Sequence, residues 1–278
     1  MMKGLLDSQG VCAAESRVGS SLRRVAPYYH HNRRRGTQNQ LNPQSYHAPY
    51  FGYNLHMDQN EKLVDYGIVF VIAVDGFSAF VAGASMMERK NNKIIYEMGY
   101  RHAVESFGLW DCVICDHGRE FYLTEFVQHY LSRQRVKEDG SLSQRPPYKQ
   151  LPSTQNNRVE RLWGEVNRSV GYPLKYALQN MERQQRLDLL DDMQRFAVSQ
   201  VAGAVATAGL RLWVASWNNH RIPGSGVPES HVGGRRNYQA AIANLPTTEE
   251  ANPLYSQSRG QLTDPSSVGS DSVPEARR

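Results

Sequence analysis

The stretch from Thr154 to Asn167, TQNNRVERLWGEVN, constrains this chain more than any other part of it. Asn156 or Asn157 can cap a helix here, because a short polar side chain accepts hydrogen bonds from the first free amides. Glu160 lies in the first turn, where the helix dipole favours an ionised carboxylate. Beside it runs an apolar stripe with helical spacing, formed by Val159, Leu162, Trp163, Val166 and Val170. Glu160 is therefore either a solvated first-turn residue or a functional acid at the edge of a buried face.

Two aspartates upstream favour the functional interpretation of Glu160. Asp58 ends the stretch YNLHMD, and Asp116 follows the apolar residues VIC and precedes HGREF. Each segment is typical of a short strand that ends in an acid. The chain therefore presents two strand-end aspartates and then a helix-borne glutamate.

This order of acids resembles the DDE catalytic core of integrases and transposases. The most similar family is the integrase core of eukaryotic mobile elements, which is related to retroviral integrase. The resemblance runs from about Tyr53 to Ile222. It is carried by four motifs, AVDGFSAF (73–80), DHGREF (116–121), NNRVERLWGEVNR (156–168) and WNNHR (217–221).

The resemblance implies DNA integration or transposition by metal-dependent phosphoryl transfer. Asp58, Asp116 and Glu160 would be the catalytic residues and the metal ligands. Two Mg²⁺ or Mn²⁺ ions are expected, because such hard cations bind carboxylate oxygens and a two-metal site stabilises both oxygens of an in-line displacement. The implied partner is DNA. A homo-oligomer is compatible with this function, but the sequence does not fix the oligomeric state.

Three other acids compete for these roles. Glu165 lies five residues beyond Glu160 and points to another side of the helix, whereas Glu160 has the family context Asn-x-x-x-Glu-Arg. Asp75 in AVDGFS is expected to be structural or to lie behind the metal ligands. Glu120 is at best an outer-sphere residue. The separation of Asp116 from Glu160 exceeds the retroviral one by several residues, and the loop 135–155 can absorb the excess, since added loop length costs little free energy.

The pattern of strands predicts an α/β, RNase H-like fold, with a mixed five-stranded sheet and helices on both faces. The apolar run at 67–74 indicates a buried central strand. It lies between expected strands at 53–59 and 78–86, which suggests an antiparallel meander. A helix from Asn91 or Asn92 to about Gly108 leads to a fourth strand at 111–115. A helix at 119–134 follows, with a short fifth strand expected near Gln134 to Lys137.

Three regions are expected along the chain. Residues 1–48 form a basic, flexible N-terminal arm, residues 49–225 form the catalytic core with a helical extension, and residues 226–278 form a polar tail. The helix at 157–182 should kink or break at Pro173, and a further helix covers about 185–217. From about Pro246 the composition is rich in Ser, Gly, Thr and Pro and predicts disorder.

The charge balance is compatible with a polyanionic partner. The formal net charge is +5 and the pI is about 9.1. The candidate DNA-binding residues are Arg33, Arg34, Arg35, Arg145, Lys149 and Asn167. The basic residues can equally belong to a flexible arm and a solvated loop, and the arginine cluster can serve nuclear targeting, which matches the nuclear location that a DNA substrate implies.

Other classes of protein are disfavoured by the sequence. No run of 18 or more apolar residues is present, so no membrane span is expected. His30 and His31 are followed by no Cys-x-x-Cys pair at a suitable spacing, which argues against zinc. Cys112 and Cys115 are expected to be buried thiols in a strand. Two alternatives remain open, a domesticated or truncated remnant that binds DNA without transfer activity, and a nuclease of the RNase H type.

Overall fold

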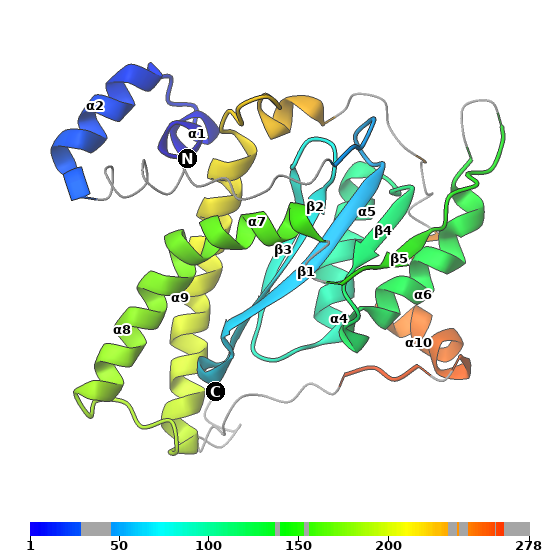
Figure 1. Cartoon of the computed structure of the whole chain (residues 1–278). Coiled ribbons are helices and arrows are strands. Elements are labelled where there is room, and N and C mark those ends of the chain that lie inside the picture. The colour runs from blue at the N-terminus through cyan, green and yellow to red at the C-terminus, as the bar shows by residue number, and fades with distance from the viewer. Residues whose placement is uncertain are drawn as a thin grey trace.

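A mixed five-stranded sheet organises the molecule (Figure 1). The computed structural model describes residues 1–28, 46–136, 140–152, 156–232, 238, 244–258 and 260–263. The strands lie in the order β3-β2-β1-β4-β5. Strand β2 pairs antiparallel with both β1 and β3, and β4 and β5 run parallel to β1. Their bounds are β1 Asn54–Leu63, β2 Ile68–Asp75, β3 Val81–Met87, β4 Cys112–Cys115 and β5 Tyr148–Gln150. This is the predicted RNase H-like arrangement.

Helices cover both faces of the sheet, as the sequence predicts (Figure 1). One face carries α7 Asn157–Val166, the π-helical segment η6 Asn167–Gly171, α8 Tyr172–Arg183 and α9 Asp192–Asn218. The other face carries α4 Asn92–Ile94, the π-helical segment η2 Ile95–Arg101, α5 His102–Phe107, α6 Tyr122–Tyr130 and α10 Thr248–Gln257. The described residues also form short 3₁₀ turns, namely η1 Val64–Tyr66, η3 Arg119–Phe121, η4 Leu131–Gln134 and η7 Pro228–His231. Because both faces are covered, all eight residues of β2 are buried, which explains its continuous apolar run.

Strand β1 alternates between two environments. Leu55 and Met57 point into the core beneath α5 and α6. The residues between them point to the face covered by α7 and are polar although they are buried, namely Asn54, His56, Asp58 and Asn60. Side chains of a strand alternate between the two faces of a sheet. Buried polar groups need partners, so this row marks the part of the sheet where polar contacts are concentrated.

Local signals account for the helix ends. Asn91 accepts hydrogen bonds from the amides of Lys93 and Ile94 and caps the helix that starts there. That helical run ends at Gly108, whose φ of 92° is accessible to glycine at little cost. Pro173 does not end the helix, but the helical hydrogen-bond pattern changes directly before it, where the segment η6 is π-helical. This proline lies in the first turn of α8, where its missing amide is not needed, and η6 carries the helix without interruption from α7.

Three expectations about the periphery are wrong. The fifth strand is Tyr148–Gln150, not the segment near Gln134, where only an isolated bridge joins Val136 and Leu142. The N-terminal arm contains two helices, α1 Met2–Ser8 and α2 Glu15–Val25, and α1 packs against α9. The tail contains α10, whose Ala251 and Tyr255 belong to the core.

Helix α9 is long and apolar enough to cross a membrane by length and composition alone, and no other helix in the described parts of the chain is. The core helix of a globular domain passes the same test. The residues of α9 that face the sheet are buried in the core with Phe70 and Ile72 of β2, namely Ala202, Ala206, Leu210 and Trp213.

Candidate active site

The parallel ladder of β1 and β4 places Asp58 and Asp116 side by side. The register pairs Asn54 with Cys112 and His56 with Ile114. Continued for two more residues, the same register sets Asp58 opposite Asp116. Paired residues on neighbouring strands point to the same face, so both carboxylates lie on the side of the sheet that α7 covers.

Helix α7 brings Glu160 to these aspartates. Val159, Leu162, Trp163 and Val166 are buried against β2, as the apolar stripe predicts. Glu160 is half-buried, and its backbone amide donates to the carbonyl oxygen of Asn156 at 3.3 Å. The helix therefore starts above β1, and its first turn presents Glu160 at the edge of the buried face.

Asn156 holds the start of α7 to β1 and does not cap the helix with its side chain. Its amide oxygen lies 2.7 Å from Nδ1 of His56, and its amide nitrogen donates to the carbonyl oxygen of Met57 at 3.2 Å. Asn156 and His56 are both buried. The sequence predicted a helix start here, but the partner on β1 comes from a part of the chain 100 residues away.

Trp163 forms a second polar contact between α7 and β1. Its indole Nε1 donates to Oδ2 of Asp58 at 2.8 Å. The sequence indicated a core tryptophan, which is correct, since the side chain is 5% exposed. The structure adds that this tryptophan orients one of the three candidate acids. Its place one turn after Glu160, on the buried side of the helix, is the sequence signal that could have revealed this contact.

Two of the three acids, Asp58 and Glu160, have raised pKa values. Burial, and then the negative charges of Glu160 and Asp116, raise the pKa of Asp58 to about 7, against the lowering effect of the Trp163 hydrogen bond. Burial and Asp116 also raise the pKa of Glu160. Acids that disfavour each other's ionised form in this way are typical of functional sites.

The chemistry of these donors fits a hard divalent cation. Carboxylate oxygens are the ligands that Mg²⁺ prefers, and a cation would relieve the repulsion among the three acids. Among the residues that the structure describes, no group of three or more histidine, cysteine, aspartate or glutamate side chains is placed so that it could hold a metal ion. The three acids thus lie in the same region, but their side chains are not arranged as the ligands of a metal centre.

The competing acids have other partners. Asp75 is fully buried and accepts hydrogen bonds from the amides of Gly52 and Ser78 and from Nε1 of Trp110, which confirms its structural role. Glu165 pairs with Arg168 at 3.0 Å on the outer side of α7.

Glu120 contacts groups beside the site. It accepts a hydrogen bond from Gln59, the neighbour of Asp58 on β1, and lies 3.4 Å from Nζ of Lys90. Gln59 points to the face of the sheet opposite to Asp58. Glu120 therefore has partners other than the three acids.

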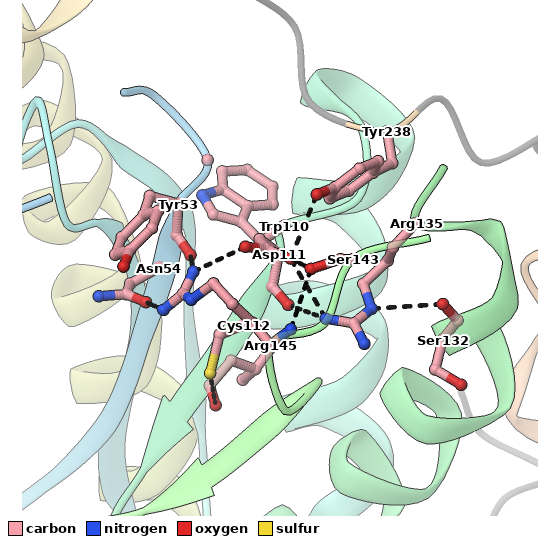
Figure 2. A network of polar contacts seen from close by, with 12 residues as sticks. Tyr53, Asn54, Trp110, Asp111, Cys112, Ser132, Arg135, Ser143, Arg145 and Tyr238 are labelled. Atoms are coloured by element: carbon pink, nitrogen blue, oxygen red, sulfur yellow. Dashed lines mark hydrogen bonds and ion pairs between the residues drawn. The ribbon is translucent and has the colours of Figure 1, made fainter. Parts of the chain in front are cut away.

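Arg145 is committed to a buried polar network and does not extend toward solvent (Figure 2). Its guanidinium donates to Oδ2 of Asp111 at 2.9 Å, to the carbonyl oxygen of Tyr53 at 2.7 Å and to Oδ1 of Asn54 at 2.7 Å. It also stacks on the ring of Tyr53. Arg135 neutralises the other side of Asp111. The prediction that Arg145 faces a DNA backbone is corrected accordingly, because its donors are used inside the protein.

Replacement of Arg145 by methionine is expected to lower the free energy of unfolding by about 2–3 kcal/mol, since Asp111 would lose one of its two cations in a buried position. Urea unfolding of the full chain measures this. Arg211→Met, which removes an exposed arginine from α9, is the matched control and should change stability little. A variant of Arg145 with normal stability and weakened DNA binding would contradict this assignment.

The other candidate DNA-binding residues differ in their placement. Lys149 is exposed and pairs in register with Ile114, so it lies on the same face of the sheet as the acids. Asn167 is 5% exposed and its Oδ1 faces the backbone of Gly171, so the prediction of a DNA contact by Asn167 is wrong. Arg33, Arg34 and Arg35 lie outside the described residues.

The two strand cysteines are buried thiols, as predicted. Burial raises the pKa of Cys112 to about 11 and that of Cys115 further above its ordinary value. Neither forms a disulfide. A thiol with a raised pKa is a poor nucleophile and a poor metal ligand at neutral pH, so these residues serve packing.

The sheet order and the helices on both faces define a core of the RNase H-like class. A family model described as "Integrase core domain" matches residues 45–227. The chain therefore belongs to the integrase core domain family.

Solved structures with a similar fold include retroviral integrases. The HTLV-2 integrase catalytic core domain in complex with magnesium, in its trimeric form, is 16% identical, with a TM-score of 0.40 and coverage of 67% of this chain and 99% of that chain. The simian T-cell lymphotropic virus intasome in complex with PP2A regulatory subunit B56 gamma is 15% identical, with a TM-score of 0.42 and coverage of 73% and 63%. No curated protein sequence matches the chain.

Proposed function

We propose that this chain cleaves and joins DNA ends by divalent-metal-dependent phosphoryl transfer, with Asp58, Asp116 and Glu160 as the acids that hold the metal. Membership of the integrase core domain family supports DNA integration at the level of the family. The observation that carries the finer proposal is the geometry: the register of β1 and β4 directs Asp58 and Asp116 to the face that α7 covers, and Glu160 lies in the first turn of that helix.

The protein's own residues would contribute position and charge. Trp163 and the backbone amide of Gln59 orient the carboxylate of Asp58. The amide of Gly118 donates to Oδ1 of Asp116 at 2.9 Å and orients that acid at the end of β4. When bound, two divalent cations supply Lewis acidity for the attacking hydroxyl and for the leaving 3′-oxygen. No histidine or cysteine nucleophile is required, in agreement with the inert buried thiols.

The test is strand transfer of a labelled, pre-cleaved DNA end by the full chain with Mg²⁺ or Mn²⁺. Joined product that disappears when the metal is chelated supports the proposal. Calorimetric titration with Mn²⁺ in the absence of DNA gives a second readout, since metal binding should weaken when one acid is neutralised. Joining that persists in the presence of a chelator would refute metal dependence.

DNA binding should be largely independent of sequence and sensitive to salt, as phosphate contacts release counterions. We predict that Lys149→Gln reduces the slope of log affinity against log salt by about 1, because it removes one phosphate contact on the face that carries the acids. Arg133→Gln removes an exposed charge after α6, which packs on the opposite face, and should leave the slope unchanged. Fluorescence anisotropy with a labelled duplex at several salt concentrations measures both. Equal slopes in the two variants would exclude Lys149 from the interface.

A second candidate function is DNA binding without transfer, by a domesticated or truncated remnant of an element. The observation in its favour is that no three acidic, histidine or cysteine side chains of the described residues are placed to hold a metal ion. The same joining experiment separates the two functions. DNA binding by a folded protein that joins no ends with either metal would favour the remnant. A nuclear location would suit both functions and follows from the DNA substrate.

A further inference from the structure

A chain of hydrogen bonds, part-buried at Arg145 and Tyr46 and buried at His56, runs along β1 to the first turn of α7. It joins the side chains of Arg145, Asn54, Tyr46, His56 and Asn156 in that order. Asn54, His56 and Asn156 are each at most 5% exposed. Solvent is therefore excluded from the bond between His56 and Asn156, and these two buried groups depend on their protein partners.

The direction of every bond in this chain is fixed by its two ends. Asn156 donates from its amide nitrogen to the carbonyl oxygen of Met57, so its amide oxygen faces His56. An amide oxygen only accepts, and Nδ1 of His56 must therefore carry the hydrogen. At the other end, Arg145 donates to Oδ1 of Asn54, which turns the amide nitrogen of Asn54 toward Tyr46.

The middle of the chain follows from these ends. Asn54 donates to Oη of Tyr46 at 2.8 Å, and the Tyr46 hydroxyl lies 2.8 Å from Nε2 of His56. Because Nδ1 holds the one hydrogen of the neutral ring, Nε2 is left as an acceptor. The Tyr46 hydroxyl therefore donates to Nε2. All donors point the same way, from Arg145 toward Met57.

This chain of hydrogen bonds ends at backbone groups next to Asp58 and Glu160. Met57 directly precedes Asp58, and the carbonyl oxygen of Asn156 accepts the amide hydrogen of Glu160. An asparagine at a helix start usually accepts hydrogen bonds from the first amides and stabilises the helix in this way. Asn156 makes no such bond and binds β1 instead. The side chain is thus used to hold α7 in register with β1.

We propose that Tyr46, His56 and Asn156 are positioning residues that set the place of Glu160 relative to Asp58 through the Nδ1–H tautomer of His56. This inference rests on the proposed function, because it assigns these residues a role in end joining. Their effect is on geometry, and a misplacement of about 1 Å at a catalytic group can cost a hundredfold in rate.

Two substitutions of His56 test the roles of its two ring nitrogens, Nδ1 and Nε2, separately. His56→Asn keeps a donor where Nδ1 lies and retains the bond to Asn156. His56→Gln keeps a polar atom where Nε2 lies and loses the bond to Asn156. We expect the single-turnover joining rate to fall about tenfold or more in His56→Gln and clearly less in His56→Asn, while the affinity for DNA stays unchanged in both. Equal losses of rate in the two variants, or no loss, would overturn the proposal.

A milder substitution keeps the proposal testable if the His56 variants do not fold. Tyr46→Phe keeps the ring that packs beside Arg158 and removes only the hydroxyl. Nitrogen-15 NMR of labelled histidine should report the Nδ1–H tautomer of His56 in the unmutated protein. Tyr46→Phe should keep this tautomer, because Asn156 still accepts from Nδ1, and should shift the Nε2 signal, because that nitrogen loses its hydrogen bond. Tyr130→Phe, at an exposed tyrosine of α6, is the control and should leave the His56 signal unchanged.

The NMR readout does not depend on activity, so it distinguishes the two proposals. If the unmutated protein joins no DNA ends, the proposed function fails. A His56 tautomer of the Nδ1–H form would then still support the hydrogen-bonded chain as the device that holds α7 to β1. The Nε2–H tautomer in the unmutated protein would overturn it whatever the activity.

Discussion

Replacement of Asp116 by asparagine is expected to reduce metal-dependent DNA joining on the order of a thousandfold or more, with the fold intact. The amide keeps the shape of the side chain and the oxygen that accepts the Gly118 amide hydrogen bond. It loses the negative charge that would hold a cation. Asp116 is only partly buried, so the neutral side chain leaves no stranded charge in the core.

The measurement is single-turnover joining at equal metal concentration, together with urea unfolding of the same preparation. Asp65→Asn is the matched control, since Asp65 is an exposed carboxylate in the turn at the far end of β1 and should tolerate the change. Mn²⁺ titration should show weaker binding in Asp116→Asn and normal binding in Asp65→Asn. Unchanged joining by Asp116→Asn would remove this residue from the site.

The sheet and the three acids could be predicted because their signals are local. The run IVFVIAV can only be a strand buried on both faces in a domain of this size, and β2 is that strand. The motif at Asn156 to Val166 combines a helix start with one apolar face, which places Glu160 without knowledge of the rest of the chain. Asp58 and Asp116 each end an apolar or alternating stretch, so their meeting at one face follows once β1 and β4 pair in parallel.

The remaining features depend on contacts between distant residues. Arg145 resembles any loop arginine until Asp111 is known to be its partner across the end of β4. Asn156 resembles a capping residue until His56 is found opposite it. Sequence patterns report periodicity and local propensity, and neither contains these pairings.

The tail contains a local signal for a helix start, and its amino-acid composition led the prediction away from that helix. Thr247 and Glu250 form a capping box, a pattern that marks a helix start in the sequence itself. The surrounding Pro, Ser and Thr residues outweighed it in the prediction of disorder. Helix α10 is stabilised by burial of Ala251 and Tyr255 against the core, which the sequence of the tail does not reveal.

The two glutamates of α7 provide the sharpest test of the site. Five positions rotate a side chain by about 500° on a helix of about 3.6 residues per turn, or about 140° net. Glu160 and Glu165 therefore cannot both face the aspartates. The structure has Glu160 close enough to Asp116 for that charge to raise its pKa, whereas Glu165 pairs with Arg168. The open backbone at Gly164 leaves room for DNA one turn beyond Glu160.

Glu160→Gln is thus expected to abolish joining of a pre-cleaved DNA end, with a loss on the order of a thousandfold or more, because it removes one of the three negative charges. Glu165→Gln should join ends at a rate close to that of the unmutated protein, since an exposed ion pair contributes at most about 1 kcal/mol to stability. Single-turnover kinetics with Mn²⁺ compares the two variants. In each of them an amide replaces one carboxylate of α7. Equal losses would show that the phase of α7 assigned here is wrong. A loss confined to Glu165→Gln would move the active face of the helix to the side of Arg168.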